Sequence, residues 1–340
     1  MMSAQSQHSM SRRSLVAIGG GRGSSQVVLG AQPYFTDCTA LVSVTDTGRS
    51  TGVARTLADI PAPGDLRNTL ATLAHDREAL LARLLQYRFR SPAVPVLDGM
   101  AFGNLLIAAL AQMTGDFAQA IAITSTLVEP TARVLPISTA NTQLCAELAD
   151  GSFRNDELAV RGLNKPPIRR VFLADPAAAY PPALEAIAAA NIVVLGPGSF
   201  FTSVFAALLF DGVVAALQQT KAMVVFVCNT TTQSGQTDGF RAIDHVARLV
   251  DHLGPGVLDV ALINRSTGLD SALVAQYAAE GLHLLEPDDN EIAEIAALGV
   301  RPLVRDYAEQ LVNKREIWNK QDTIRHDPAR LGTALWELLQ

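Results

Sequence analysis

The sequence predicts an α/β fold in which helices cover both faces of a doubly wound, mostly parallel sheet. Short apolar runs with the length of buried strands alternate with longer runs that have the apolar spacing of helices. Apolar residues make up 49% of the 340 residues and charged residues only 18%, so the chain can bury a large core. Three of the apolar runs end in polar, glycine-containing loops, where open α/β sheets bind ligands. These observations together indicate a Rossmann-like architecture.

Five apolar runs predict the strands of this sheet, and they cover residues 14–18, 39–45, 192–195, 223–228 and 257–263. Between residues 128 and 175 the pattern changes, with candidate strands at 134–138, 143–148 and 165–173. Proline occurs in this segment and restricts strands to sheet edges or strand starts, so we expect a small, irregular β-containing insertion. We expect residues 1–12 to form a flexible tail and residues 13–340 to form a single α/β domain.

Apolar periodicity predicts the helices. Leucines recur at helical spacing after Asp65, which predicts a helix over residues 66–86 with Asp65 as its N-cap. Residues 102–113 are apolar almost all round, as expected of a fully buried helix. Further helices are expected at residues 181–190, 203–219, 240–252, 271–280 and 306–318, and after Pro328.

Charge and composition exclude several classes of protein. A net charge of −6 lacks the clustered Lys and Arg that a nucleic-acid backbone requires. No run approaches the ~20 apolar residues of a membrane helix, which argues against an integral membrane protein. The pair Arg12 and Arg13 resembles a twin-arginine export signal, but the apolar stretch behind it is too short. Three cysteines lack disulfide or metal-site spacing, so we expect a cytoplasmic protein.

Three loops follow predicted strands and carry the candidate ligand-binding residues. The first loop, residues 19–25, contributes Gly19, Gly20, Gly21, Arg22, Gly23 and Ser24. The second loop, residues 196–203, contributes Gly196, Gly198, Ser199 and Thr202, and the third loop, residues 229–239, contributes Asn229, Gln233, Thr237 and Asp238. Glycine lets a backbone approach a ligand, and a helix start behind it attracts an anion. A single loop of this kind is equally well an ordinary turn, but three of them favour a nucleotide-like ligand.

An ordered set of motifs resembles the CofD/YvcK family. The set consists of Gly19-Gly-Gly-Arg-Gly, Val44-Thr-Asp-Thr-Gly-Arg-Ser-Thr-Gly, Pro61-Ala-Pro-Gly-Asp-Leu-Arg-Asn, Gly103-Asn-Leu-Leu, Leu195-Gly-Pro-Gly-Ser-Phe-Phe-Thr-Ser, Cys228-Asn, Gln233-Ser-Gly-Gln-Thr-Asp-Gly and Arg325-His-Asp-Pro. The resemblance implies a CofD-like domain and adds further ligand-binding candidates: Asp46, Arg49, Ser50, Asp65, Arg67, Asn68 and Asn104. The segments at 61–68, 103–106 and 233–239 are more similar to the YvcK branch, also called gluconeogenesis factors, than to the 2-phospho-L-lactate transferases.

Two arginines depart from the family pattern. Arg22 replaces the threonine of Gly-Gly-Gly-Thr-Gly, and Asp-Asp-Gly-Gly-Ser-Ser-Gly appears as Asp46-Thr-Gly-Arg-Ser-Thr-Gly, so Arg49 replaces a glycine. Of the family's two adjacent carboxylates only Asp46 is retained, which makes a poorer Mg²⁺ site. The arginines can instead supply positive charge to a phosphate directly.

The resemblance leaves two functions open. The first is a binding protein for a UDP-sugar or another nucleotide, acting in carbon metabolism and in cell-envelope or cell-shape control, with a regulatory protein partner and homo-oligomers to be expected. The second is a CofD-like enzyme that moves a phospholactyl-like group from a guanylyl donor to an alcohol, with Mg²⁺ as cofactor. Asp46 is then the catalytic residue or metal ligand; no confident metal site or certain cofactor is predicted. His245, alone on the helix after the third loop, reads as a packed residue.

Overall fold

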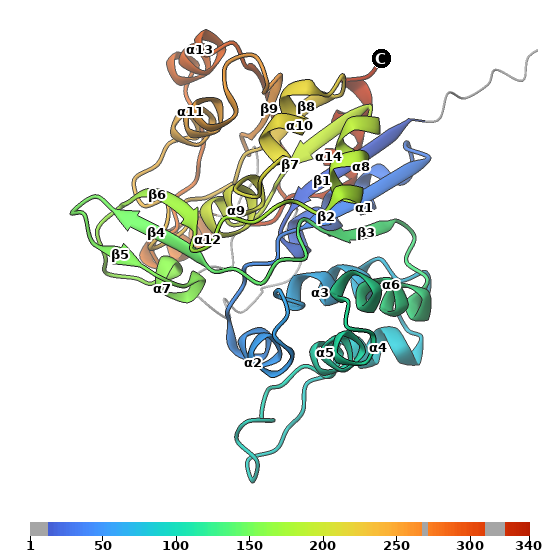
Figure 1. The fold of residues 1–340 in the computed structure, drawn as a ribbon. Helices are drawn as coiled ribbons and strands as arrows, with labels where there is room; N and C mark the ends of the chain where they lie inside the picture. The colour runs from blue at the N-terminus through green and yellow to red at the C-terminus, as the bar shows by residue number, and fades with distance from the viewer. Residues whose placement is uncertain (1–12, 267–270, 310–323) are drawn as a thin grey trace, which may run out of the picture.

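A seven-stranded parallel sheet forms the centre of the computed structural model, which describes residues 13–266, 271–309 and 324–340 (Figure 1). The strand order is β10-β9-β8-β7-β1-β2-β3, and every neighbouring pair is parallel. The strands are β1 (Ser14–Gly19), β2 (Asp37–Val42), β3 (Arg133–Pro136), β7 (Ile192–Leu195), β8 (Met223–Val227), β9 (Val260–Asn264) and β10 (Arg301–Arg305). The predicted α/β fold with a doubly wound parallel sheet is confirmed.

The chain reverses its direction across the sheet between β1 and β7. From β1 it proceeds outward through β2 to β3, then returns to β7 on the other side of β1 and continues through β8 and β9 to β10. This is the topological switch point at which open α/β sheets bind their ligands. The first loop leaves β1 and the second loop leaves β7, so both lie at this point.

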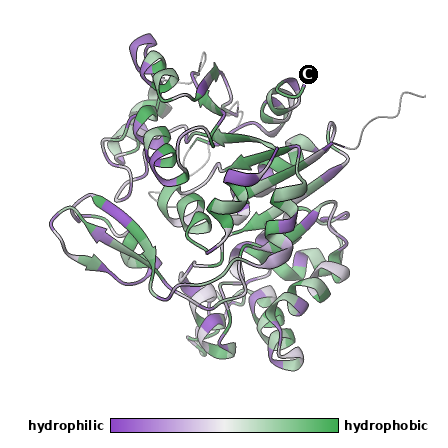
Figure 2. Cartoon of the chain, turned by 45° about the horizontal axis from the view of Figure 1, so that its top comes forward, coloured by the Kyte–Doolittle hydropathy of each residue, from purple (hydrophilic) through white to green (hydrophobic). Residues whose placement is uncertain are grey.

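Helices cover both faces of the sheet (Figure 1). The helices are α1 (Gly21–Ala31), α2 (Arg49–Ala58), α3 (Gly64–Thr72), α4 (Leu80–Gln86), α5 (Phe102–Thr114), α6 (Phe117–Val128), α8 (Pro181–Ala189), α9 (Ala206–Leu208), α10 (Val213–Gln219), α11 (Ala242–Leu253), α12 (Ser271–Ala279), α13 (Asp289–Ala297) and α14 (Pro328–Glu337), with a π-helical turn, η1 (Phe200–Phe205), before α9. The central strands are predominantly hydrophobic (Figure 2), since parallel strands are buried on both faces.

A small antiparallel sheet projects from this body (Figure 1). It consists of β4 (Leu144–Leu148), β5 (Phe153–Arg154) and β6 (Ile168–Leu173) in the order β5-β4-β6, with α7 (Glu157–Arg161) between β5 and β6. This is the predicted β-containing insertion. The strand expected at 134–138 does not belong to it, because β3 pairs in parallel with β2 at the edge of the large sheet.

Two predicted helices are each broken in the structure. The helix predicted over 66–86 divides into α3 and α4, because the backbone of residues 73–75 bonds to residues 129–131 instead of continuing the helix. Asp65 is not its N-cap, since α3 begins at Gly64 after Pro63. The helix predicted over 203–219 stops before Asp211, whose N–H and carbonyl bond to Ala177 and Ala179.

Other predictions need smaller corrections. The helix predicted at 102–113 is not fully buried: α5 buries one face, whereas its Met113 side chain is 81% exposed. Of the helix predicted at 306–318, residues 306–309 are not helical and the rest lie outside the described residues, as does the predicted tail. The sequence analysis missed α2, α6, α7, α13, β5 and β10. Within the described ranges, no helix combines the length and the apolar character needed to cross a membrane.

Candidate functional site

The first and second loops meet backbone to backbone at the switch point. A Cβ atom at Gly23 would overlap the carbonyl oxygen of Pro197, and a Cβ atom at Gly21 would overlap the backbone of Asp65. Close approach of α1 to its neighbours therefore requires glycine at these two positions, whatever ligand binds. At Gly20 a Cβ atom would instead meet side chains, lying 2.6 Å from Ser203 Oγ. Of these three glycines, Gly20 is therefore the one whose nearest neighbours are side-chain atoms.

Hydrogen bonds join the second loop to the third. The Asn229 side-chain amide donates to the Gly198 carbonyl at 2.8 Å, and the Phe200 N–H donates to Gln233 Oε1 at 2.9 Å. Within the third loop, the Gln233 N–H donates to the hydroxyl of Thr237 at 2.8 Å. Asn229, Gln233 and Thr237 therefore lie together beside the second loop, as expected for a common site.

Several buried polar atoms of these loops have no hydrogen-bond partner among the described residues. They are Ser24 Oγ in the first loop and Asn229 Oδ1, Thr231 Oγ1 and both amide atoms of Gln236 in the third. Buried polar groups in native proteins are nearly always paired, because an unpaired one costs about 1–3 kcal/mol. A ligand or ordered water would supply the missing partners.

A second group of residues lies at the carboxyl end of β2, where the negative charge of Asp46 acts on the carboxylates of Asp65 and Glu157. Burial and the negative charge of Asp46 raise the pKa of Asp65 to about 6, partly offset by a hydrogen bond from the Gly21 N–H. Burial also raises the pKa of Glu157 to about 7; its ion pair with Arg161, at 3.2 Å, opposes this rise and Asp46 adds to it. One Glu157 carboxylate oxygen is buried without a hydrogen-bond partner among the described residues.

Glu157 and Arg161 belong to α7 and were missed in the sequence analysis. The insertion brings them to Asp46: the Leu158 N–H donates to the Thr47 hydroxyl at 3.2 Å. Nothing in the sequence around residue 157 signals this contact, because it depends on how the small sheet folds back onto the loop after β2.

A buried arginine, Arg55, was also missed. Its guanidinium donates to Asn141 Oδ1 at 2.8 Å, to the Thr142 carbonyl at 2.7 Å and to the carbonyls of Thr45 and Asp46 at 3.4 and 3.3 Å. Burial lowers its pKa, and the charge of Asp46 partly offsets this effect. Arg55 thereby fixes the loop that carries Asp46 against the segment leading to the insertion.

Four family-derived candidates make packing contacts among α2–α5. Arg67 donates to Gln86 Oε1 at 2.6 Å, and Asn68 Oδ1 accepts from the Gln86 amide at 2.9 Å. Ser50 Oγ accepts from the Asn104 amide at 2.9 Å. These bonds give each of the four residues a structural role, and ligand contact by them stays a prediction.

The two arginines that depart from the family pattern are both exposed. Arg22 lies in the first turn of α1, and Arg49 is the first residue of α2. Arg49 adopts a φ of 37°, a left-handed conformation that L side chains rarely occupy.

The aromatic and histidine residues near the second loop form core. Phe200 and Phe201 are 0% and 1% exposed, and the His245 ring packs 4.6 Å from the Phe200 ring. Burial lowers the pKa of His245 to about 4, so it is neutral at physiological pH. This agrees with the expectation of a packed His245, and it leaves neither phenylalanine free to stack on a base.

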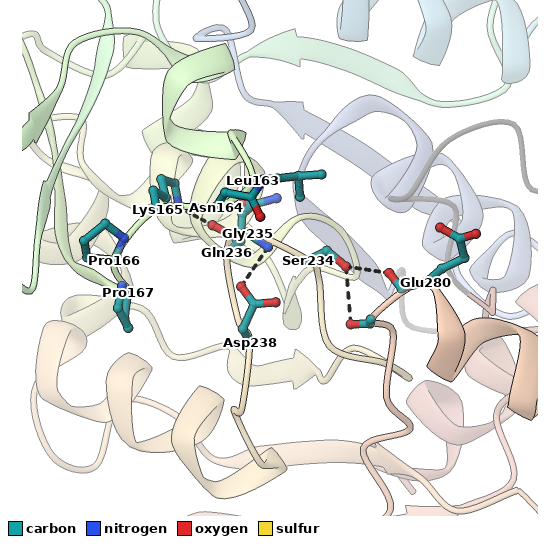
Figure 3. Close-up of a pocket in the computed structure, with 11 residues that line it drawn as sticks. Leu163, Asn164, Lys165, Pro166, Pro167, Ser234, Gly235, Gln236, Asp238 and Glu280 are labelled. Carbon is teal, nitrogen blue, oxygen red and sulfur yellow. Dashed lines mark hydrogen bonds between the residues drawn. The ribbon is translucent and has the colours of Figure 1, made fainter.

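Asp238 and part of the third loop face a different space. A cavity of about 410 Å³ lies between residues 163–167, the segment 234–238 and residues 280–281 (Figure 3). The Asp238 carboxylate accepts a hydrogen bond from the Gly235 N–H at 2.7 Å. Across the parts of the chain that the structure describes, no three Asp, Glu, His or Cys side chains are grouped to hold a metal ion.

Comparisons with known proteins match this chain along most of its length. The profile of the family described as 2-phospho-L-lactate transferase CofD matches residues 15–308. The gluconeogenesis factor of Halalkalibacterium halodurans is 36% identical over 96% of this chain and 97% of its own length. That of Bacillus subtilis is 35% identical over 97% of this chain and 100% of its own length. A crystal structure of a UPF0052 family protein from Bacillus halodurans superposes with a TM-score of 0.86 at 34% identity, covering 96% of this chain and 99% of that one.

Proposed function

Since the chain belongs to the CofD family and its full-length relatives are gluconeogenesis factors, we propose that it binds a nucleotide of the UDP-sugar class at the switch point. The proposed site is bounded by the first, second and third loops. It lies at the carboxyl ends of β1, β7 and β8, where a doubly wound sheet holds nucleotides.

One observation carries this proposal: two buried side-chain oxygens in the loops at the switch point have no hydrogen-bond partner among the described residues. Ser24 Oγ and Asn229 Oδ1 lack partners among the described residues, although each comes from a loop that directly follows a central strand. The N-cap of α1, Gly20, provides no side-chain cap, and although the Asp65 carboxylate accepts from the Gly21 N–H, the positive end of the helix still attracts an anion. A diphosphate here would be attracted by the helix start and by the positive charge of Arg22.

The biological role follows from the relatives. We infer a cytoplasmic regulator of carbon metabolism whose ligand occupancy changes a surface read by a regulatory protein partner or by a second copy of the chain. In this role the protein is a sensor and needs no catalytic step.

A CofD-like transferase is the second candidate, and the carboxylates of Asp46, Asp65 and Glu157 favour it. Burial and, to a smaller extent, the charge of Asp46 raise the pKa values of Asp65 and Glu157, and a divalent cation would favour the ionised forms of both. Asp46 and Asp65 would hold the ion, which would neutralise charge on a phosphate donor. This candidate requires binding that depends on Mg²⁺.

Thermal unfolding with and without nucleotides tests the proposal. A ligand at 100 times its Kd adds about 2.7 kcal/mol to the free energy of unfolding, which in a chain of this size raises Tm by about 4 °C. UDP-N-acetylglucosamine and UDP-glucose should produce this rise in the presence of EDTA. If UDP-sugars, GTP, GDP and NAD all leave Tm unchanged at millimolar concentration, no nucleotide site exists at the switch point. A rise with guanine nucleotides that needs Mg²⁺ would favour the transferase.

A further inference from the structure

The unpaired atoms of the proposed site are closed to a ligand in this conformation. Ser24 Oγ and Asn229 Oδ1 are buried, besides having no hydrogen-bond partner among the described residues. A ligand can pair with these atoms only after some part of the protein has moved away from them. Binding at the switch point therefore requires a conformational change.

The insertion contacts the body on both sides of the switch point. On the β2 side, the Leu158 N–H donates to the Thr47 hydroxyl at 3.2 Å. On the β8 side, the Lys165 ammonium group donates to the carbonyl of Gly235 in the third loop (Figure 3). β7 and β1 lie between β8 and β2 in the sheet, and α7 also lies beside η1. The segment from α7 to Lys165 therefore crosses the switch point at the carboxyl ends of these two central strands.

The base of the insertion is firmly attached to the body. The chain enters the insertion through residues 137–143 and leaves it through residues 174–180, and these two segments are joined by backbone hydrogen bonds. Arg55 donates to Asn141 Oδ1 at 2.8 Å and to the Thr142 carbonyl at 2.7 Å, and both Arg55 and Thr142 are buried. Hydrogen bonds from a charged donor are stronger than neutral ones. This base can therefore stay in place while the rest of the insertion moves.

The contacts at the far end of the insertion are weaker. Lys165 is only half-buried, and the Arg248 guanidinium donates to the Arg169 carbonyl at 2.7 Å close to the surface. Apolar burial adds little, since the side chains of Leu158 and Leu163 are 50% and 43% exposed. Regions with few buried apolar contacts and solvent-exposed hydrogen bonds open at a low free energy.

The contact at Gly235 is close but contains no side chain from the third loop. A Cβ atom at Gly235 would lie 2.6 Å from the Gly162 carbonyl oxygen, so backbone meets backbone here. Such surfaces can separate without any side chain of Gly235 leaving a pocket. The hydrogen bond from Lys165 is then the polar link that holds them together.

We propose that the insertion, residues 144–173, is a lid that opens on residues 137–143 and 174–180 as its hinge, with Lys165 as its latch. Opening uncovers the switch point and admits the nucleotide, and closure over the bound nucleotide slows its release. Lys165 is a positioning residue in this role, because it acts through Gly235 and touches no ligand. The entry of a nucleotide rests on the proposed function, whereas the opening of the unliganded lid does not.

Hydrogen exchange of the unliganded protein, followed residue by residue by NMR, tests the lid. The Leu158 N–H is the reporter, because it belongs to the insertion whereas its acceptor, Thr47, belongs to the body. Lys165→Met removes the latch bond and keeps a long side chain. It should speed exchange at Leu158 about fivefold, which corresponds to losing one hydrogen bond of about 1 kcal/mol. Lys165→Arg, which can donate to the same carbonyl, should restore the wild-type rate.

The matched control is Lys221→Met, the same change at an exposed lysine that precedes β8. It should leave exchange at Leu158 unchanged. Faster exchange in Lys165→Met that is confined to residues 163–165 and 234–236 would show local fraying and would overturn the lid. Identical exchange in Lys165→Met and wild type would overturn the latch.

Nucleotide dissociation, measured by stopped flow with UDP-glucose, tests the link to binding. Release requires an open lid, so the nucleotide should leave Lys165→Met about fivefold faster than wild type, and Lys165→Arg should restore the slow rate. Saturating nucleotide should also slow exchange at Leu158. Protection of residues 19–25 and 196–203 with no change at Leu158 would overturn the lid and leave the nucleotide site intact. Faster Leu158 exchange in Lys165→Met, without UDP-sugar binding by wild type, would overturn the proposed function and support the lid.

Discussion

The carbonyl oxygen of Pro197 occupies the space that a side chain at Gly23 would need. This contact joins the loops that follow β1 and β7, the two strands between which the chain reverses direction. The switch point is thus built by direct backbone packing, and part of its glycine content serves the fold before it serves a ligand.

Gly23→Ala should therefore destabilise the protein. The new methyl group collides with backbone, which cannot turn aside, and overpacking of this kind costs roughly 1–3 kcal/mol or more. Urea unfolding of the unliganded protein measures the loss. Gly48→Ala is the matched control, since Gly48 has an ordinary φ of −68° and its Cβ atom would meet no atom closer than 3.3 Å. Equal stability of the two variants would contradict the packing described here.

Gly20→Val should separate binding from folding. A side chain at Gly20 meets Ser203 Oγ and Asp65 Oδ2, at 2.6 and 3.1 Å from its Cβ atom, and these side-chain atoms can move. We expect a folded protein that no longer binds nucleotide, because valine fills the space beside the helix start. Circular dichroism and the nucleotide-dependent shift in Tm check the two parts. A folded variant with unaltered affinity would reduce the first loop to a structural turn.

Arg49→Gly should have opposite effects on stability and on binding. Glycine accepts the φ of 37° that strains arginine by about 1–2 kcal/mol, although its greater freedom in the unfolded chain offsets part of the gain. The free energy of unfolding should stay equal or rise by up to about 1 kcal/mol. Nucleotide binding should weaken by roughly 1.5–3 kcal/mol through loss of a charged hydrogen bond.

The same measurement on Arg22→Thr, which restores the residue typical of the family, should show a similar loss of affinity. Wild-type binding should persist in EDTA and weaken with added salt. Binding that requires Mg²⁺ and survives both replacements would show that the arginines do not supply the charge, and would favour the transferase.

Glu157 should make the protein less stable at alkaline pH. Its pKa rises from 4.5 to about 7 on folding, so between these values the native state binds more protons than the unfolded state. The contribution of the Glu157 carboxyl to the free energy of unfolding is complete below pH 4.5 and is lost as the pH rises through 7. The loss is at most about 3 kcal/mol. Glu157→Gln should match wild type near pH 4 and exceed its stability at pH 8.

Denaturant unfolding at several pH values provides the check, with Glu147→Gln as control. Glu147 lies in the same small sheet but pairs with Arg169 and Arg170 near the surface, and its pKa is lowered. It should contribute no slope between pH 5 and 8. A Glu157→Gln variant that loses stability in parallel with wild type across this range would show that Glu157 is already ionised.

The sequence located most strands of the large sheet because each buried strand of a parallel sheet is a local apolar run, whereas β10 was missed and β3 was assigned to the insertion. The run 192–195 coincides with β7, and 14–18 falls within β1. Helix continuity was harder to predict. The leucine spacing across 66–86 is helical, yet residues 73–75 pair with a segment more than 50 residues away, and periodicity carries no information about such a partner.

Local sequence by itself determined the fold class, the three loops after β1, β7 and β8, and the family to which the chain belongs. It did so because strands, glycine turns and ordered motifs are encoded by neighbouring residues. Only the tertiary structure decided which polar atoms are left unpaired and which carboxylates repel one another. Glu157 interacts with Asp46 across more than 100 residues of sequence. Burial and charge interactions of this kind arise from the assembled chain, so no local pattern could predict them.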